Sequence, residues 1–236
     1  MSNIKINSDM MKITELFDEK RSIAWEYLAE LKWIWDALPL IESFVQKLGP
    51  TLDIAEYDSC PETSLEKKPE NVWIHKSADI APSAFIGPNV IIGANTQVRH
   101  CAFVRGPAII GENAVIGNST EIKNAILFDG VQVPHYNYIG DSIFGYKAHT
   151  GAGVITSNVK SDFSLVDVVC GEERIATSLK KFGAILGDFV EVGCNAVLNP
   201  GTVVGAKTNI YPLSMVRGFL PANSIYKKQG EVVEKR

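Results

Sequence analysis

The segment from Ile74 to Ile122 reads IHKSAD-IAPSAF-IGPNVI-IGANTQ-VRHCAF-VRGPAI-IGENAV-IGNSTE-I. Every sixth residue of this segment is Ile or Val, without a break in register. The same period returns later in the chain, at Leu186, Val192, Leu198, Val204, Ile210 and Val216. A period of six fits neither an α-helix nor an alternating strand, so it indicates an internal repeat. Short strands joined by tight corners and stacked coil on coil form a β-solenoid, whose core is this aliphatic ladder.

The hexapeptide repeat is similar to that of the left-handed parallel β-helix acyltransferases. In that superfamily three hexads make one triangular coil, so one coil takes about 18 residues. The handedness and the three-sided section are implied by this resemblance, whereas the period comes from the residues themselves. We therefore expect a mainly β fold, a left-handed parallel β-helix with a short helical N-terminal segment.

The composition is that of a globular chain without a strong charge bias. The 236 residues are 46% hydrophobic and 21% charged, and the formal net charge is −4. This balance does not favour nucleic acid or an anionic membrane as a partner. The apolar runs are too short to span a bilayer, and residues 1–11 lack an apolar signal core. The four cysteines show no C-x-x-C spacing, so we expect reduced thiols and a cytoplasmic protein.

The chain divides into four expected segments. Residues 1–50 form a helical N-terminal segment and residues 51–72 a linker without periodicity. Residues 73–225 form the β-helix, and residues 226–236 a charged C-terminal tail outside it.

Within the N-terminal segment, apolar residues recur at three- and four-residue steps from Ile23 to Leu38. This pattern predicts one helix, which Ser22 would cap and Pro39 would end or kink. Leu40 to Leu48 are expected to form a second short helix before Gly49-Pro50. Three of the four tryptophans lie in the first of these helices. We expect them to pack against the solenoid, to cover its end, or to contact another subunit.

Two irregularities interrupt the repeat. The aliphatic step shortens from six to five residues at Leu127 and again at Phe144. Residues 159–182 then break the pattern altogether. Alternation from Ser164 to Val169, followed by a turn and a return over Arg174 to Thr177, predicts an inserted hairpin or loop at a corner.

Two cations follow core residues one coil apart. Arg105 comes directly after Val104 and Lys123 after Ile122, with regular hexads between them. On successive coils they would stack about 4.8 Å apart. Cations this close repel one another unless an anion lies between them, and phosphate is the natural candidate. The alternatives are that Glu112 or Glu121 screens the pair, or that both cations point into water.

His135 lies in the segment Pro134-His-Tyr-Asn-Tyr-Ile-Gly-Asp141, after the first shortened step and within one coil of Lys123. A neutral imidazole near an anion-holding pair is a candidate general base for an incoming amine or hydroxyl. The alternative is a structural histidine beside aromatic residues.

A metal site is not expected. Zinc enzymes that resemble the γ-class carbonic anhydrases need three histidines, two of them in a close H-x-x-x-x-H pair. The histidines of this chain offer no such pair; they are His75, His100, His135 and His149.

A closer resemblance covers roughly residues 73–220. The matching motifs, in order, are Arg105-Gly-Pro, Gly117-Asn-Ser-Thr-Glu-Ile-Lys123-Asn, His135 with Tyr138-Ile-Gly-Asp141, and Gly151-Ala-Gly-Val-Ile-Thr-Ser-Asn158. These motifs resemble the acetyltransferase half of the bifunctional glucosamine-1-phosphate acetyltransferase/N-acetylglucosamine-1-phosphate uridyltransferase family. The 72 residues before the repeat are too few for the nucleotidyltransferase half, so uridylyl transfer is not expected.

The resemblance implies a role for each matching residue. The general base falls on His135, and the phosphate-binding cations fall on Arg105 and Lys123. The sugar-contacting side chains fall on Tyr138 and Asn158. The implied reaction is acetyl transfer from acetyl-CoA, as co-substrate, to the amine of an amino-sugar phosphate or nucleotide sugar. The implied assembly is a homotrimer.

Four positions depart from the family pattern. His149 replaces a substrate-side Asn, and Val159-Lys160 replaces Tyr-Asp. Cys194 replaces a Ser near the acetyl group, and Pro212 replaces an Ala near the CoA arm. We therefore assign His149 to the substrate, and Cys194 and Pro212 to the cofactor. These departures keep a second hypothesis open, a non-catalytic or regulatory β-helix subunit that binds a sugar nucleotide or partners a nucleotidyltransferase.

Overall fold

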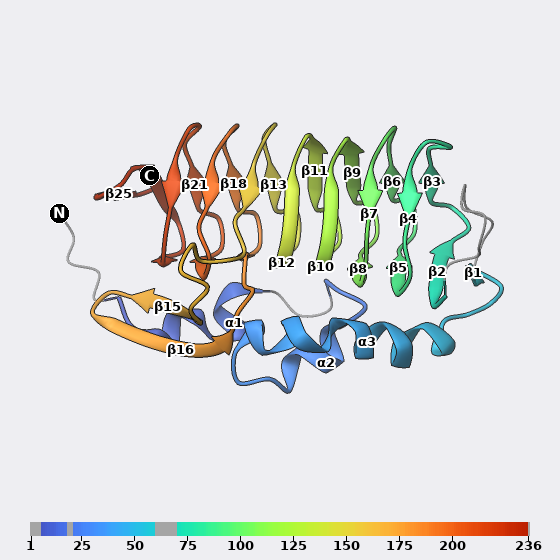
Figure 1. Ribbon diagram of the computed structural model, residues 1–236, viewed down its shortest axis with the longest axis horizontal. Coiled ribbons are helices and arrows are strands. Elements are labelled where there is room, and N and C mark those ends of the chain that lie inside the picture. The colour runs from blue at the N-terminus through green and yellow to red at the C-terminus, as the bar shows by residue number, and fades with distance from the viewer. Residues whose placement is uncertain (1–5, 18–20, 60–69, 236) are drawn as a thin grey trace.

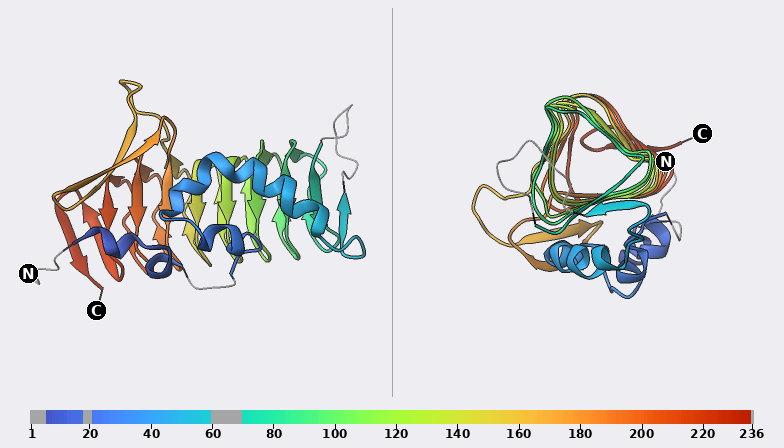
Figure 2. Two further views of the ribbon diagram at one scale, coloured as in Figure 1. Left: turned by 90° about the horizontal axis from the view of Figure 1, so that it is seen from below. Right: turned by 90° about the vertical axis from the view of Figure 1, so that its right-hand side faces the viewer.

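The computed structural model describes residues 6–17, 21–59 and 70–235. Parallel strands follow one another along the molecule, with helices and a hairpin along one side (Figure 1). Seen along the long axis, the strands wind into a triangular solenoid (Figure 2). The expected fold class, a mainly β left-handed parallel β-helix with a short helical N-terminal segment, is confirmed.

The strands form three faces, and neighbouring coils pair in parallel. The first face contains β2 (Val72–His75), β5 (Val90–Ile92), β8 (Ala108–Ile110), the second halves of β10 (Glu121–Leu127) and β12 (Tyr138–Phe144), β17 (Ala184–Leu186), β20 (Thr202–Val204) and β23 (Phe219–Leu220). The second face contains β3 (Asp79–Ile80), β6 (Gln97–Val98), β9 (Val115–Asn118), β11 (Gln132–His135), β13 (His149–Thr150), β18 (Glu191–Val192), β21 (Asn209–Ile210) and β24 (Ser224–Lys228). The third face contains β4 (Phe85–Ile86), β7 (Phe103–Val104), the first halves of β10 and β12, β14 (Ile155–Thr156), β19 (Val197–Leu198) and β22 (Met215–Val216).

The pairing register explains the shortened steps. Val104 pairs with Ile122, a coil of 18 residues, whereas Ile122 pairs with Ile139, a coil of 17. The missing residue is removed at the corner between the third and first faces, where β10 and β12 run from one face to the next without a break. This corner is therefore tighter than the other corners of the same coils.

The first face is apolar on both sides of its sheet. Side chains alternate between inward and outward along a strand, yet the middle residues of these strands are fully buried. They are Ile91, Ile109, Ile126, Ile143, Ile185 and Val203. The N-terminal helices and the inserted hairpin lie beneath this side of the triangle (Figure 2) and cover the outward row. Burial of each such side chain contributes roughly 1.5–3 kcal/mol relative to exposure, so this layer is a second apolar core.

The N-terminal segment is a series of short helices, of which α3 (Ile41–Leu48) matches the second helix expected over Leu40 to Leu48. They are η1 (Ser8–Met11), α1 (Ile13–Leu16), α2 (Trp25–Ala29), η2 (Ile34–Leu40), α3 (Ile41–Leu48) and η3 (Gly49–Thr51). The helix expected from Ile23 to Leu38 is interrupted because Trp33 is extended and its N–H donates to the Asp36 carboxylate at 3.2 Å, which starts η2 anew. Pro39 lies inside η2, and α3 follows directly.

The tryptophan-rich segment packs along the side of the solenoid, not over its end. Trp35 is fully buried, and its ring centroid lies 5.9 Å from that of Phe182, which ends the insertion. Ser22 Oγ accepts a hydrogen bond from the Ala24 N–H at 3.2 Å. The N-terminal segment and the insertion thus meet on the first face.

The remaining segments extend the sheets. In the linker, β1 (Tyr57–Ser59) pairs antiparallel with β2, and residues 60–69 lie outside the described part of the chain. The insertion forms an antiparallel hairpin of β15 (Val166–Cys170) and β16 (Glu173–Leu179). The expected boundary at residue 226 falls too early, because Tyr226 pairs with Ile210 in the wall of the solenoid, and β25 (Glu231–Glu234) folds back onto β24. No helix in the described residues is long and apolar enough to cross a membrane.

Candidate functional site

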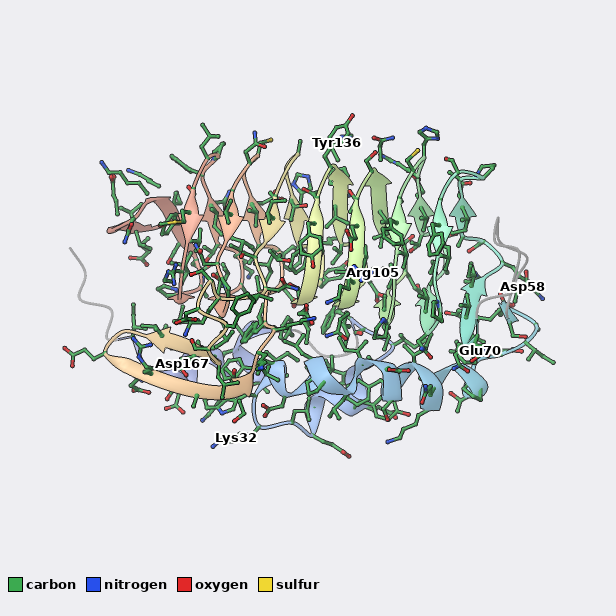
Figure 3. All side chains as sticks on the ribbon, viewed as in Figure 1. Lys32, Asp58, Glu70, Arg105, Tyr136 and Asp167 are labelled. Atoms are coloured by element: carbon green, nitrogen blue, oxygen red, sulfur yellow. The ribbon has the colours of Figure 1, made fainter. Side chains whose placement is uncertain are left out.

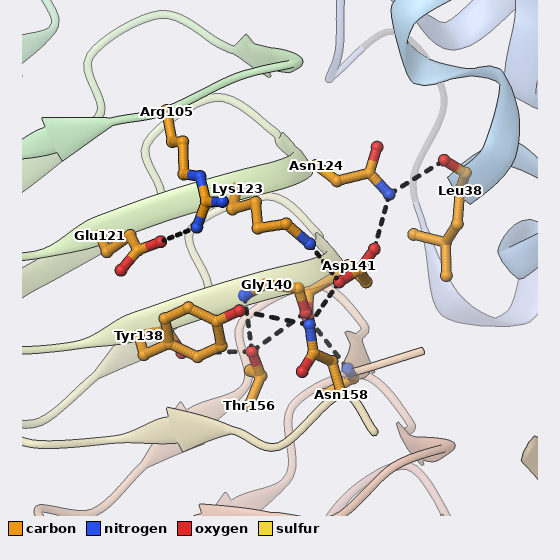
Figure 4. Close-up of polar contacts among 12 residues, drawn as sticks. Leu38, Arg105, Glu121, Lys123, Asn124, Tyr138, Gly140, Asp141, Thr156 and Asn158 are labelled. Atoms are coloured by element: carbon orange, nitrogen blue, oxygen red, sulfur yellow. Dashed lines mark hydrogen bonds and ion pairs between the residues drawn. The ribbon is translucent and has the colours of Figure 1, made fainter. Parts of the chain in front are cut away.

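Polar side chains gather around Asp141 at the corner between the third and first faces (Figure 4). Lys123 Nζ lies 3.1 Å from Asp141 Oδ2, and Asn124 Nδ2 donates to Oδ1 at 2.9 Å. The amide of Asn158 also donates to Asp141 Oδ2, and to the hydroxyl of Tyr138 at 3.2 Å. Asp141 is 4% exposed, so a nearly dry carboxylate is surrounded by donors.

The tight corner brings these residues together. Asn124, Asp141 and Asn158 are spaced 17 residues apart, one on each coil. Asn124 and Asp141 have φ angles of 49° and 48°, in the left-handed region that Asn and Asp tolerate better than most residues with a side chain. Asn124 also donates to the carbonyl of Leu38 at 3.1 Å, which links this corner to η2.

Arg105 lies on the coil next to Lys123, as the 18-residue spacing predicts. Both cations have a carboxylate partner within the chain: Arg105 Nη1 lies 3.2 Å from Glu121 Oε1, and Lys123 pairs with Asp141. Of the two carboxylates considered as screens, Glu121 does screen Arg105. Glu112 instead lies at another corner, where its backbone N–H donates to the Asp129 carboxylate. The four charges sum to zero.

His135 lies on the second face, around a corner from this cluster. Its side chain is exposed, and its imidazole makes no hydrogen bond or ion pair with the residues that the structure describes. Tyr136, the next residue, is 64% exposed and projects from the same edge of the molecule (Figure 3).

Backbone hydrogen bonds define a column at this edge. On one side His135 pairs with Asn118. On the other side its carbonyl accepts a hydrogen bond from the N–H of Gly153, so Ala152 lies beside His135 on the next coil. The same pattern joins Ala152 to Cys194 and Cys194 to Pro212. His135 therefore shares one edge of the solenoid with Cys194 and Pro212, the two residues assigned to the cofactor.

His149 also lies on the second face, in register with Gln132 and Glu191. Its Nδ1 is 2.7 Å from Glu191 Oε2. The pair lines a hollow of about 430 Å³ with Gln132, Lys147 and Phe189 among its walls. Tyr138 is on the third face, so one chain does not bring it together with His149.

Three residues of these clusters were not assigned from the sequence. They are Asn124, Asp141 and Glu191. Asn124 and Asp141 could have been found from the short polar residues 17 apart in the shortened coils, whereas Glu191 carries no comparable signal. Among the described residues there is no group of three or more His, Cys, Asp or Glu that could hold a metal ion.

Several known proteins are similar to this chain. The family model of the GMPPB C-terminal domain matches residues 102–211. The bifunctional protein GlmU of Methanococcus vannielii is 29% identical over 160 residues, which are 67% of this chain and 34% of that protein. The chain thus spans about a third of such curated relatives.

A relative of similar length also matches. The uncharacterized acetyltransferase YaiX of Escherichia coli is 33% identical over an alignment of 213 residues, which covers 83% of this chain and 87% of that protein. Among solved structures, the polysialic acid O-acetyltransferase OatWY matches with a TM-score of 0.42 at 14% identity, over 70% of this chain and 84% of that chain.

Proposed function

Since the chain belongs to the hexapeptide-repeat, left-handed β-helix acyltransferases, we propose that it is an acyl-CoA-dependent N-acyltransferase for an amino-sugar phosphate or nucleotide sugar. The observation that carries this proposal is the column of His135, Cys194 and Pro212 at one edge of the solenoid. Successive coils lie about 4.8 Å apart, so an extended acyl-CoA arm along this edge would pass each residue in turn. An exposed imidazole at one end would then meet the acyl group.

In the proposed reaction His135 acts as the general base. The nitrogen of the acceptor amine attacks the thioester carbonyl, and His135 accepts the proton that the amine loses. A carbon–nitrogen bond forms, the carbon–sulfur bond breaks, and the CoA thiolate leaves and takes up a proton. Backbone N–H groups of neighbouring coils would hold the oxyanion that develops on the carbonyl oxygen.

The acceptor would lie against the third face. Arg105 and Lys123 would bind its phosphate, and Tyr138 and Asn158 would contact the sugar. An ammonium has three donors, so Lys123 retains donors for a phosphate after its bond to Asp141. The exposed pair of Arg105 with Glu121 is a weak surface interaction that a phosphate could replace.

We also propose a homotrimer, in keeping with closed symmetry for a prism-shaped subunit. The N-terminal layer and the hairpin cover the first face, which leaves the second and third faces for subunit contacts. Contact between the second face of one subunit and the third face of the next would join His149 to Tyr138. Analytical ultracentrifugation should give a trimer, and a monomer at micromolar concentration would contradict the proposal.

One observation favours the second candidate, a non-catalytic subunit that binds a sugar nucleotide or partners a nucleotidyltransferase. Both cations assigned to the phosphate are paired with carboxylates of the same chain. Calorimetric titration with acetyl-CoA, followed by chromatographic assay of CoA release with a panel of amino sugars, separates the two. Binding with transfer supports the acyltransferase; sugar-nucleotide binding without acetyl-CoA binding supports the second candidate.

A further inference from the structure

We propose that Asp141 is the positioning residue of the acceptor site, acting on the acceptor through Lys123 and Asn158. This inference rests on the proposed function and deepens it. Neither the family motifs nor the spacing of the cations assigned a role to Asp141. In the structure its carboxylate is bonded to Lys123, Asn124 and Asn158 together.

Burial holds this arrangement in place. A carboxylate that is 4% exposed loses most of its hydration, so protein donors must replace the lost hydrogen bonds to water. Lys123, Asn124 and Asn158 supply those donors, and Asn124 is itself fixed by the Leu38 carbonyl. The side chain of Lys123 is only 18% exposed, so its ammonium is confined beside Asp141. Its unused donors remain available to an anion at this corner.

Asp141 also decides which way the amide of Asn158 points. A carboxylate only accepts hydrogen bonds, so the Nδ2 of Asn158 must face it, and the same Nδ2 reaches the Tyr138 hydroxyl. The carbonyl oxygen of Asn158 therefore points away from Asp141 (Figure 4). A carbonyl acceptor beside a confined ammonium suits a ligand that carries both an anionic group and hydroxyl or amine donors. Amino-sugar phosphates and nucleotide-linked amino sugars have this chemistry.

A purely structural role is the alternative. Asp141 could simply hold the tight corner and, through Asn124, dock η2 onto the solenoid. The two roles differ in what a substitution changes. A positioning role changes the affinity for the acceptor and spares acyl-CoA, whereas a structural role changes the stability of the fold and spares the affinity of the folded molecules.

The test compares Asp141→Asn with Asp129→Asn in the full chain. Asp129 is a half-buried carboxylate at a different corner, and its Oδ1 accepts from the N–H of Glu112 at 2.8 Å. Binding of glucosamine 1-phosphate and of UDP-glucosamine is measured calorimetrically without acyl-CoA, and acetyl-CoA binding is measured separately. We expect Asp141→Asn to weaken binding of at least one acceptor about tenfold or more, with acetyl-CoA affinity within about twofold of wild type. Asp129→Asn should leave both affinities unchanged.

A double-mutant cycle with Lys123→Met adds a second readout. If Asp141 acts through Lys123, Asp141→Asn should cost much less acceptor affinity in the Lys123→Met background than in wild type. Full additivity of the two changes, or a lower Tm of Asp141→Asn with unchanged acceptor affinity, would overturn the inference. So would a wild-type protein that binds neither acceptor.

The proposed function fails separately. If the wild type binds an acceptor in an Asp141-dependent way but transfers no acyl group to it, the N-acyltransferase proposal is overturned and the role of Asp141 stands.

Discussion

His149 and Glu191 lie opposite each other on adjacent strands of the second face, with Nδ1 of the imidazole 2.7 Å from Oε2 of the carboxylate. Because a carboxylate only accepts hydrogen bonds, this contact orients the ring with Nδ1 toward Glu191. The pair borders the hollow of about 430 Å³ that Lys147 and Phe189 also line. An oriented imidazole therefore lies at the position where the family resemblance implies a substrate-side Asn.

The first prediction concerns acceptor preference. The imidazole is larger than an asparagine and narrows the space in front of the second face. We therefore expect wild type to use glucosamine 1-phosphate poorly and another amino-sugar phosphate or a nucleotide-linked amino sugar better. His149→Asn should shift kcat/KM toward glucosamine 1-phosphate, and Glu191→Gln should shift it less, because it only loosens the ring.

The measurement is kcat/KM across a panel of amino-sugar phosphates and nucleotide sugars. His100→Asn is the matched control, since this ring bonds Ser83 on a distant coil. If glucosamine 1-phosphate is already the best substrate and His149→Asn leaves the order of the panel unchanged, His149 does not select the acceptor.

The second prediction concerns the base. His135→Ala should lower kcat roughly 10²- to 10⁴-fold, because the amine then loses its proton to water instead of to a positioned imidazole. Acetyl-CoA affinity should stay near wild type, as measured by calorimetry. His75→Ala, at the first coil of the solenoid, is the control. An His135→Ala enzyme with wild-type kcat would move the base elsewhere, with His149 the next candidate.

The third prediction concerns the acyl-CoA path. Cys194 is exposed on the edge that it shares with His135 and Pro212, so bound acetyl-CoA should cover its thiol and slow its alkylation by iodoacetamide. Cys101 is also exposed and should react at the same rate with or without acetyl-CoA. Cys170 should stay unmodified, because burial raises the pKa of its thiol to about 11.

Mass spectrometry of labelled peptides, in a Cys60→Ser background, gives each rate separately. Equal protection of Cys101 and Cys194 would indicate a general effect of ligand on the protein. No protection of Cys194 would place the acyl-CoA arm on another edge.

The fold could be predicted because an aliphatic residue occupies every sixth position of the repeat. The run from Ile74 to Ile122 specifies the core ladder whatever the rest of the chain does. The covered first face could also have been predicted. Its outward row has the spacing of the coil, from Ile91 and Ile109 to Ile126 and Ile143, and outward aliphatics on every coil indicate a covering layer. The breaks in the N-terminal helices could not have been predicted, because the start of η2 at Trp33 depends on a single hydrogen bond from its N–H to the Asp36 side chain.

The candidate site was only partly readable. The stacking of Arg105 and Lys123 follows from an 18-residue spacing, and the structure has that register. Their carboxylate partners depend on the coil lengths around them. The shortened steps at Leu127 and Phe144 locate the missing residues, but they do not show that Asp141 bonds to Lys123 across that corner. No spacing in the sequence indicates which face of a neighbouring subunit would meet His149 in the proposed trimer.

The last prediction is a pH dependence of opposite sign at two aspartates. Burial, with the nearby charge of Glu112, raises the pKa of Asp129 above its ordinary value of 3.8. At Asp162 the N–H and hydroxyl of Ser164 donate to the carboxylate and lower its pKa below 3.8. A raised pKa makes a contribution to stability that is complete below the unfolded pKa and is lost as pH rises through the folded pKa. A lowered pKa makes a contribution to stability that is present above the unfolded pKa and is lost as pH falls through the folded pKa.

At neutral pH, Asp129→Asn should therefore raise Tm, since asparagine keeps the Oδ1 acceptor for the Glu112 N–H and removes the buried charge. Asp162→Asn should lower Tm slightly. Both differences should shrink as the pH of thermal unfolding is lowered toward about 3. Shifts of the same sign at the two positions, or differences that do not change with pH, would contradict the argument from burial at Asp129.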